Sequence, residues 1–510
     1  SLCHIEKIFV GFSKNGVRTY SKQFNLNREP LRNLLAVQSQ IIDSQQTFFE
    51  VNLGHIVKQF LRWRKLLPRV RPFYAVKCQP DPKVLELLAS LGAGFDCASQ
   101  EEMELAINNC RKAYNSINID IETSNKIIAD NIIFANPFKF KQDMVFAGSY
   151  GIQKTTFDSE GELYRLKRYW PSAKLLIRVS TRKKFSAKCQ LGDKFGVNSN
   201  NIEKLLKKAK ELEFDIAGVS FHVGNMCEDF SAWPDTVEYC AEVMDLITKL
   251  GYNPTLLDIG GGYPGLSSVI TDFEVKLQED FEKMCIELNS ALDTYYSDRF
   301  TIISEPGTFF VHGAYTLATE VIGKRQIEES EYSQEFYIDQ SIPSQDRTVK
   351  IGSLDAVMFE NPSNLHSIKV LDEPVDDFKR YIYILDDGVY GSFNVLQFME
   401  FKFLLIGILN PNASIKNFIS DEKCYVSKLY GPTCDTLDCI SPASNLPEMD
   451  VGDWLVWVDM GAYTNASRSD FNGITKPNSY YYISNEDKEI IDSIKKIVRN
   501  DVLKRFHAIQ

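Results

Sequence analysis

Eight short apolar segments recur between Phe73 and Gly307, and their spacing constrains the fold more than any other feature. Each ends in small, polar or charged residues, and helix-like sequence separates most of them. The segments span residues 73–77, 94–99, 132–136, 151–158, 174–180, 217–224, 256–262 and 301–307. A spacing of roughly 20 to 45 residues is what a parallel strand and its crossover helix require. The pattern predicts an α/β fold with a (β/α)8 TIM barrel, and an open doubly wound sheet is the structural alternative.

Beyond about residue 313 the pattern changes to strand-like runs at 381–385, 454–458 and 480–483, with few helical periods. We therefore expect a second, β-rich domain of modified Greek-key type over residues 313–484, to which the N-terminal segment 1–47 contributes. Residues 48–312 form the expected barrel. The polar, irregular stretch 324–379 predicts an insertion. The tail 485–510 repeats apolar residues at helical spacing, which indicates a docked surface helix, with a partner-binding segment as the alternative.

Charge and cysteine usage exclude several classes of protein. The formal net charge of −11 argues against nucleic acid as the main partner, because phosphate binding needs a basic face. The sequence contains no run of about 18 apolar residues, the length that would predict a membrane span. The first residues lack the charged and then apolar pattern of a signal peptide. The 11 cysteines show no paired spacing, which favours reduced thiols in a cytoplasmic protein without a structural metal.

Lys77 lies at the end of the first segment, in the run RPFYAVKCQPD. Burial at a strand end predicts a lowered pKa, and a neutral amine can form a Schiff base with a carbonyl cofactor. A single lysine at such a place more often points into solvent, so the hypothesis depends on its neighbours. In a barrel the carboxyl ends of the strands converge. The polar and glycine residues at these ends are Lys77, Asp96, Arg178, His222, Gly260, Gly261, Gly262 and Glu305.

These residue types match the needs of a pyridoxal phosphate enzyme: a lysine, an acid facing the pyridinium nitrogen, a group stacked on the ring and a phosphate cradle. Glu305 in SEPG could hold the ring nitrogen protonated. His222 in SFHVG could lie flat on the ring, although a histidine on an apolar strand is more often a core residue. The glycines of LDIGGGYPG offer backbone N–H groups to a phosphate. Pro264 disfavours the dinucleotide-binding alternative, because it breaks the expected turn into a helix.

The order of the motifs carries a family resemblance. PFYAVKC, GFDCAS, ANPFK, SFHVG, LDIGGGYPG, SEPG, DDGVYGSFN, GPTCDTLD, LPEMDVGDW and MGAYT follow one another along the chain. In these motifs the chain resembles the ornithine decarboxylase and antizyme inhibitor family, pyridoxal phosphate proteins with an alanine racemase-like barrel. The resemblance covers about residues 48–483.

The resemblance implies a role for each matching position. Lys77 would carry the cofactor as an aldimine, with support from Asp96 and Glu102, and Arg178 would bridge near the ring and Glu305. His222 would stack on the ring, and Tyr463 would join the glycine run at the phosphate. Cys434 would protonate the substrate carbon and Asp435 would pair with the distal amine of ornithine. Both would come from a second subunit, which implies a homodimer with shared active sites.

The chain departs from the family pattern at the phosphate and at the substrate amine. Thr308 stands where the family carries a phosphate-binding arginine, and threonine supplies no charge. Asn225 and Met226 replace a serine and a small residue. Phe398 and Met399 replace a Tyr-Asp pair, and Glu400 is one residue out of register, so on a strand it would face the opposite side.

These observations predict pyridoxal phosphate-dependent decarboxylation of L-ornithine to putrescine, a step of polyamine biosynthesis, with weakened cofactor and substrate contacts. One alternative is a non-catalytic regulator of the antizyme inhibitor type, and another is decarboxylation of lysine or diaminopimelate. The segment that corresponds to the family's antizyme-binding surface, 136–158, carries Lys139, Lys141 and Lys154. This basic set could face an acidic partner or form a solvated edge.

Overall fold

A closed barrel of eight parallel strands forms the first part of the chain. In the computed structural model the described residues are 46–183, 185, 187–189, 194–268, 272–327, 357–359, 379–398, 403–409 and 424–509. The barrel strands are β2 (Val70–Ala75), β3 (Gly94–Asp96), β4 (Ile132–Phe134), β5 (Lys154–Phe157), β6 (Lys174–Arg178), β8 (Asp215–Ser220), β10 (Leu256–Asp258) and β11 (Thr301–Ser304). Each predicted segment overlaps one of them, and β11 closes the ring by pairing with β2. The predicted TIM barrel is therefore confirmed, and the open sheet is excluded.

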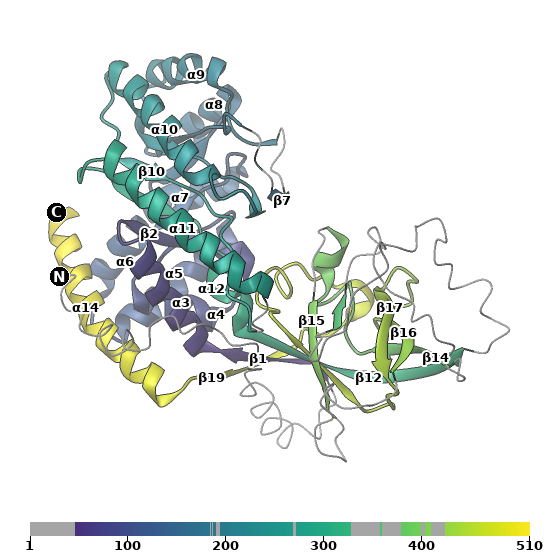
Figure 1. The fold of residues 1–510 in the computed structure, drawn as a ribbon. Helices are drawn as coiled ribbons and strands as arrows, with labels where there is room; N and C mark the ends of the chain where they lie inside the picture. The colour runs from purple at the N-terminus through teal and green to yellow at the C-terminus, as the bar shows by residue number, and fades with distance from the viewer. Residues whose placement is uncertain are drawn as a thin grey trace.

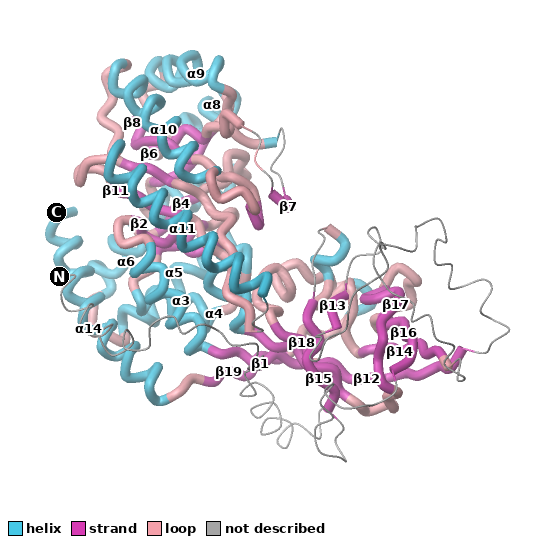
Figure 2. Tube along the Cα trace, viewed as in Figure 1, coloured by secondary structure: helices cyan, strands magenta, loops and turns pink. Residues whose placement is uncertain are grey.

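Helices surround the barrel and alternate with its strands, as Figures 1 and 2 show. They are α3 (Leu53–Leu66), α4 (Pro82–Leu91), α5 (Gln100–Asn115), α6 (Ile121–Asp130), α7 (Lys141–Tyr150), α8 (Glu160–Tyr169), α9 (Ser199–Glu211), α10 (Ala232–Lys249) and α11 (Asp272–Tyr295), followed by the short α12 (Thr308–Val311). Helix α4 shows how the sequence sets these boundaries. Asp81 caps its first turn, Pro82 occupies the first position, and Gly92 ends it with φ of +93°.

In the described part of the chain, a second domain is built on a sheet of nine strands. The strands are β1 (Phe48–Asn52), β12 (Tyr315–Ile327), β13 (Val357–Phe359), β14 (Arg380–Leu385), β15 (Phe403–Leu409), β16 (Cys424–Tyr430), β17 (Cys439–Pro447), β18 (Trp454–Val458) and β19 (Asn478–Tyr482). The long β12 leaves the barrel side and pairs with β1, β14 and β18, so it anchors the domain. The predicted β-rich domain is confirmed. A separate ribbon pairs β7 (Ala187–Cys189) with β9 (Asn225–Cys227).

Two expected boundaries differ from the structure. Strand β1 pairs antiparallel with β12 and parallel with β19, so residues 48–52 belong to the second sheet rather than to the barrel. Strand β12 continues to Ile327, and β13 lies at 357–359, so the predicted insertion 324–379 contains strand residues at these places. Backbone pairing to distant strands decides both cases, which local polarity does not reveal. The segment 1–45 lies outside the described residues.

The tail forms one long helix, α14 (Asn485–Ile509), which lies along the outside of the barrel (Figure 1). It buries Ile490, Ile491, Ile494 and Val498 and contacts α3, α4 and α6. The apolar stripe read from the sequence is therefore covered by the chain's own barrel. Among the helices that the structure describes, none is both long and apolar enough to cross a membrane.

Candidate active site

Lys77 forms an ion pair with Asp96 at the carboxyl ends of the first two barrel strands. Lys77 stands in the one-turn 3-10 helix η1 (Val76–Cys78), which follows β2. Its Nζ lies 2.6 Å from Asp96 Oδ2. Asp96, the last residue of β3, is 2% exposed. Partial burial of the side chain, which stays 41% exposed, lowers the pKa of Lys77, but the negative charge of Asp96 beside it outweighs this effect, so this pKa lies above the ordinary value for lysine. The predicted lowering was wrong because the sequence placed the lysine without its acidic partners.

Glu305 and Asp258 form a hydrogen-bonded pair of buried carboxyl groups. Glu305 follows β11 and is 6% exposed, while Asp258 ends β10 and is fully buried. Burial and the charges of Asp258 and Asp96 raise the pKa of Glu305 well above its ordinary value. Asp258 accepts hydrogen bonds from Ser220 Oγ at 2.9 Å and from the N–H of Gly260 at 3.0 Å. Burial also raises the pKa of Asp258, so the pair shares a proton, and the two hydrogen bonds that Asp258 accepts favour its position on Glu305.

Sequence reasoning missed Asp258. The signal was present, because this aspartate directly precedes the glycine run in LDIGGG and ends a barrel strand. Its carboxyl orients the first glycine N–H and also sets the protonation of Glu305.

His222 is held as a neutral imidazole beside the glycine run. Its Nδ1 accepts a hydrogen bond from the N–H of Gly224 at 3.0 Å, which leaves the proton on Nε2. Burial and the cations Arg178 and Lys77 keep the pKa of His222 well below its ordinary value. A Cβ on Gly261 would come within 3.2 Å of His222 Nε2, so the ring packs directly on this loop. A neutral, flat ring fits the predicted stacking role.

The glycine run has the shape of an anion cradle. Gly260 and Gly262 have φ of +63° and +101°, which side chains rarely adopt. A Cβ would lie 2.3 Å from the carbonyl oxygen of Phe221 at Gly260, and 2.3 Å from that of Gly224 at Gly262. Among the described residues, the N–H groups of Gly261 and Gly262 form no hydrogen bond. The residues present therefore fit a phosphate group.

Thr308 packs against the end of the glycine run, because a Cβ on Gly265 would lie 2.8 Å from its carbonyl oxygen, and Tyr463 lies beside Cys78. Thr308 is 7% exposed, and its side chain hydrogen-bonds the thiol of Cys78, whose pKa burial raises to about 12. Its hydroxyl is thus engaged by Cys78, and no charge replaces the family arginine. Tyr463 has φ of +58°, and its N–H donates to the Cys78 carbonyl at 2.9 Å. Such a φ is strained for a tyrosine, as often occurs at functional sites.

Asn225 opens strand β9 and pairs with Cys189 of β7, next to the loop that carries His222. The side chain of Met226 lies outside the described residues. Glu102 accepts a hydrogen bond from the N–H of Ala98 at 2.6 Å, so it fixes the loop that follows Asp96.

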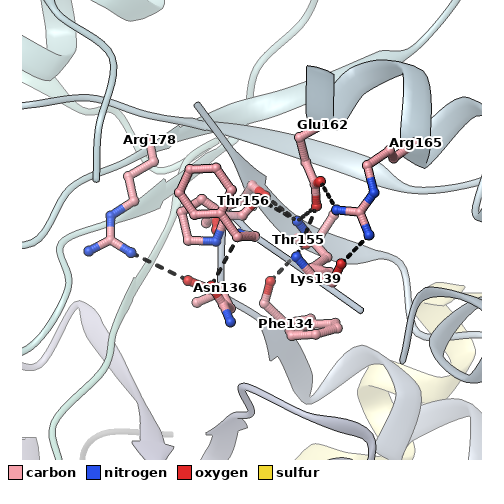
Figure 3. A network of polar contacts seen from close by, with 11 residues as sticks. Phe134, Asn136, Lys139, Thr155, Thr156, Glu162, Arg165 and Arg178 are labelled. Atoms are coloured by element: carbon pink, nitrogen blue, oxygen red, sulfur yellow. Dashed lines mark hydrogen bonds and ion pairs between the residues drawn. The ribbon is translucent and has the colours of Figure 1, made fainter. Parts of the chain in front are cut away.

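Arg178, the last residue of β6, points toward the end of β4 (Figure 3). Its guanidinium lies 3.5 Å from the carbonyl oxygen of Ala135 and 4.8 Å from the centroid of the Phe195 ring. In the described structure, these contacts hold the Arg178 guanidinium, rather than the expected bridge to Glu305. Arg178 still acts on the site, because its charge helps to keep His222 neutral.

The expected basic set of Lys139, Lys141 and Lys154 is not a basic surface. Lys139 has a fully buried side chain whose Nζ lies 3.0 Å from Glu162 Oε1, and Arg165 binds the other oxygen of Glu162 at 2.6 Å (Figure 3). Lys154 pairs with Asp130. Lys141 alone is exposed. The prediction was wrong because the acids come from elements that lie beside β4 and β5 only in the folded barrel.

The predicted substrate residues Cys434, Asp435 and Phe398 all lie in the second domain. Cys434 is exposed, and Asp435 accepts a hydrogen bond from the hydroxyl of Tyr390, whose ring lies 4.5 Å from that of Phe471. Phe398 is 72% exposed at the end of the short helix η7 (Asn394–Gln397). Met399 and Glu400 lie outside the described residues. Sequence reasoning missed Tyr390, although it stands in the DDGVYG motif.

Fold and site together define a class of protein. A barrel whose strand ends gather a lysine, a protonated buried carboxyl and a glycine cradle is the arrangement of a pyridoxal phosphate-binding barrel. Residues 53–312 match the family described as "Pyridoxal-dependent decarboxylase, pyridoxal binding domain", and the chain belongs to this family.

Similar proteins extend the match beyond the barrel. Ornithine decarboxylase of Mus musculus is 37% identical over 89% of this chain and 84% of that protein. Antizyme inhibitor 2 of Xenopus laevis is 36% identical over 89% of this chain and 85% of that protein. The solved structure of the Paramecium bursaria Chlorella virus arginine decarboxylase matches with a TM-score of 0.68 and 28% identity. It covers 88% of this chain and all of that one.

Proposed function

We propose that the chain catalyses the pyridoxal phosphate-dependent decarboxylation of L-ornithine to putrescine, in the cytoplasm. The observation that carries this proposal is the adjacency of the Lys77–Asp96 ion pair to the protonated Glu305. Similarity to ornithine decarboxylases supports the choice of substrate. The bound cofactor would supply an electron sink for the carbanion left by the departing carboxylate.

Each group of the site then has a defined task. Lys77 is the nucleophile, and it must lose a proton before its Nζ can attack a carbonyl carbon. Asp96, at 2.6 Å, is placed to take part in that transfer. With the cofactor bound, Glu305 would face the ring nitrogen, the neutral His222 would stack on the ring, and the glycine run would hold the phosphate.

A spectral titration with pyridoxal phosphate tests the proposal. The wild-type protein should develop the visible absorption band of a lysine-bound cofactor, and Lys77→Ala should not. Release of carbon dioxide from ornithine, lysine and arginine, measured side by side, then identifies the substrate. Absence of the band at saturating cofactor would end the enzyme proposal.

We also propose that the active site is completed by a second copy of the chain. Within one chain, the described residues give no contact between the loop of Cys434 and Asp435 and the Lys77 site. Leu437 of this loop and Phe398 of the same domain are exposed. If sites are shared, mixing the inactive variants Lys77→Ala and Cys434→Ala should restore about a quarter of the activity, because half of the random dimers carry one intact site. No recovery on mixing would show that each chain holds a complete site.

A non-catalytic regulator of the antizyme inhibitor type is the second candidate. The hydrogen bond between Thr308 and Cys78 favours this candidate, because Thr308 carries no charge and the phosphate therefore lacks a charged partner at this position. The similarity to antizyme inhibitor 2 points the same way. A protein that binds antizyme but shows neither the visible band nor release of carbon dioxide would establish this candidate instead.

A further inference from the structure

A buried carboxylate, Asp459, connects two segments that approach the phosphate cradle from different domains. Asp459 follows strand β18, is 4% exposed and has φ of +60°. Its Oδ2 accepts a hydrogen bond from Ser267 Oγ at 2.5 Å, and its Oδ1 accepts one from the N–H of Ser268 at 2.7 Å. One side chain of the β domain therefore holds two consecutive residues of the barrel.

Both segments stand next to residues with a proposed role at the cofactor phosphate. Ser267 and Ser268 follow the glycine run that ends at Gly265, and Asp459 stands shortly before Tyr463 in the run DMGAYT. Ser268 is fixed further, because its hydroxyl donates to the carbonyl of Gly313 at 3.1 Å. A displacement of Asp459 would therefore be transmitted both to the glycine run and to the tyrosine.

Close backbone packing gives these segments little freedom to adjust on their own. The N–H of Gly461 donates to the carbonyl of His312 at 3.1 Å, and a Cβ on Gly461 would lie 1.7 Å from the carbonyl oxygen of Val311. On the other side, a Cβ on Gly265 would lie 2.3 Å from the Cβ of His312. The two segments thus meet on the same short turn, with Asp459 as the polar group between them.

We propose that Asp459 is a positioning residue for the cofactor phosphate. By accepting hydrogen bonds from Ser267 and Ser268, Asp459 fixes the position of the glycine run relative to Tyr463. Both groups can then bind the same phosphate. This role rests on the proposed binding of pyridoxal phosphate. It involves no contact between Asp459 and the reacting atoms.

The test is the dissociation constant for pyridoxal phosphate, from the visible band, in the full-length protein. Asp459→Ala removes both acceptors and should weaken cofactor binding about tenfold, while turnover at saturating cofactor changes less than about twofold. Asp459→Asn keeps an acceptor for the N–H of Ser268 and can donate to Ser267, so its dissociation constant should stay near that of the wild type. Ser267→Ala removes one bond and should lie between the two.

Asp453→Ala is the matched control, because Asp453 is also buried, stands at the other end of β18 and accepts from the N–H of Asp450. It should leave cofactor affinity unchanged. Equal affinity in the wild type, Asp459→Ala and Ser267→Ala would overturn the inference, and so would equal losses in Asp459→Ala and Asp453→Ala. If the wild type itself gives no band, the proposed function fails instead.

Discussion

At the scale of single residues, the site is governed by charges that sit beside one another at strand ends. Lys77 keeps its proton because the carboxylate of Asp96 faces it, whereas Glu305 keeps its proton because it is buried beside Asp258 and Asp96. The carboxyl groups of Asp96, Asp258 and Glu305 thus keep a cation and a neutral acid side by side. A substitution at any of them will change the protonation of the others.

Thr308 provides a direct test of the phosphate site. Thr308→Arg would place a charged donor where the family has one, and a charged hydrogen bond contributes about 1.5 to 3 kcal/mol. We expect the cofactor concentration for half-maximal activity to fall at least about tenfold. Thr308→Val is the matched control. It removes a hydroxyl that is bonded to Cys78, so it should leave the cofactor demand unchanged.

At the scale of elements, the sequence was sufficient for the barrel and for the residues at its strand ends. Regular spacing of apolar segments predicted all eight strands, and the polar and glycine residues at six of the strand ends predicted the candidate site. Contacts between distant elements were not predictable in this way. Asp459 and Ser267 are 192 residues apart, and nothing near Asp459 in the sequence indicates that pairing.

In the loop after β4, too, a contact with a distant element that the sequence does not reveal contributes to stability. Lys139 looks like a surface lysine in the sequence, but Glu162 of helix α8 buries it in an ion pair, and burial lowers its pKa to about 8. Lys139→Ala should leave the buried carboxylate with Arg165 alone and lower the free energy of unfolding by about 3 kcal/mol.

Lys141→Ala, two residues away on the exposed face, should change the free energy of unfolding by less than about 0.5 kcal/mol. Urea denaturation of both variants gives the comparison. A loss at Lys141 as large as that at Lys139 would show that the ion pair is not what stabilises this loop.

At the scale of the whole molecule, the two domains meet over a cluster of ionisable groups around Asp459. Glu274 of helix α11 lies on the barrel side of this cluster, where burial and the charge of Asp459 raise its pKa to about 7. On the same side, burial lowers the pKa of His55 to about 4, while Asp459 opposes the shift and His312 and Lys58 add to it. The junction therefore responds to pH in the neutral range.

The sign of that response follows from proton binding. Between about pH 4.5 and 7 the folded chain keeps the proton of Glu274 while the unfolded chain has lost it, so this residue lowers stability as the pH rises. Glu274→Gln should raise the melting temperature above pH 7 and leave it nearly unchanged below pH 4.5. A melting temperature that rises equally at both pH values would contradict the assignment.

The pairing of β1 with both β12 and β19 has a consequence for biosynthesis. Phe48, Phe49 and Val51 leave the ribosome before any barrel strand, yet their partner strands begin at Tyr315 and Asn478. A nascent chain must therefore carry this apolar strand unpaired while the complete barrel is translated. The first described strand of the sheet pairs with the last one, so translation of β19, rather than growth of the barrel, sets the moment at which these described strands can all pair.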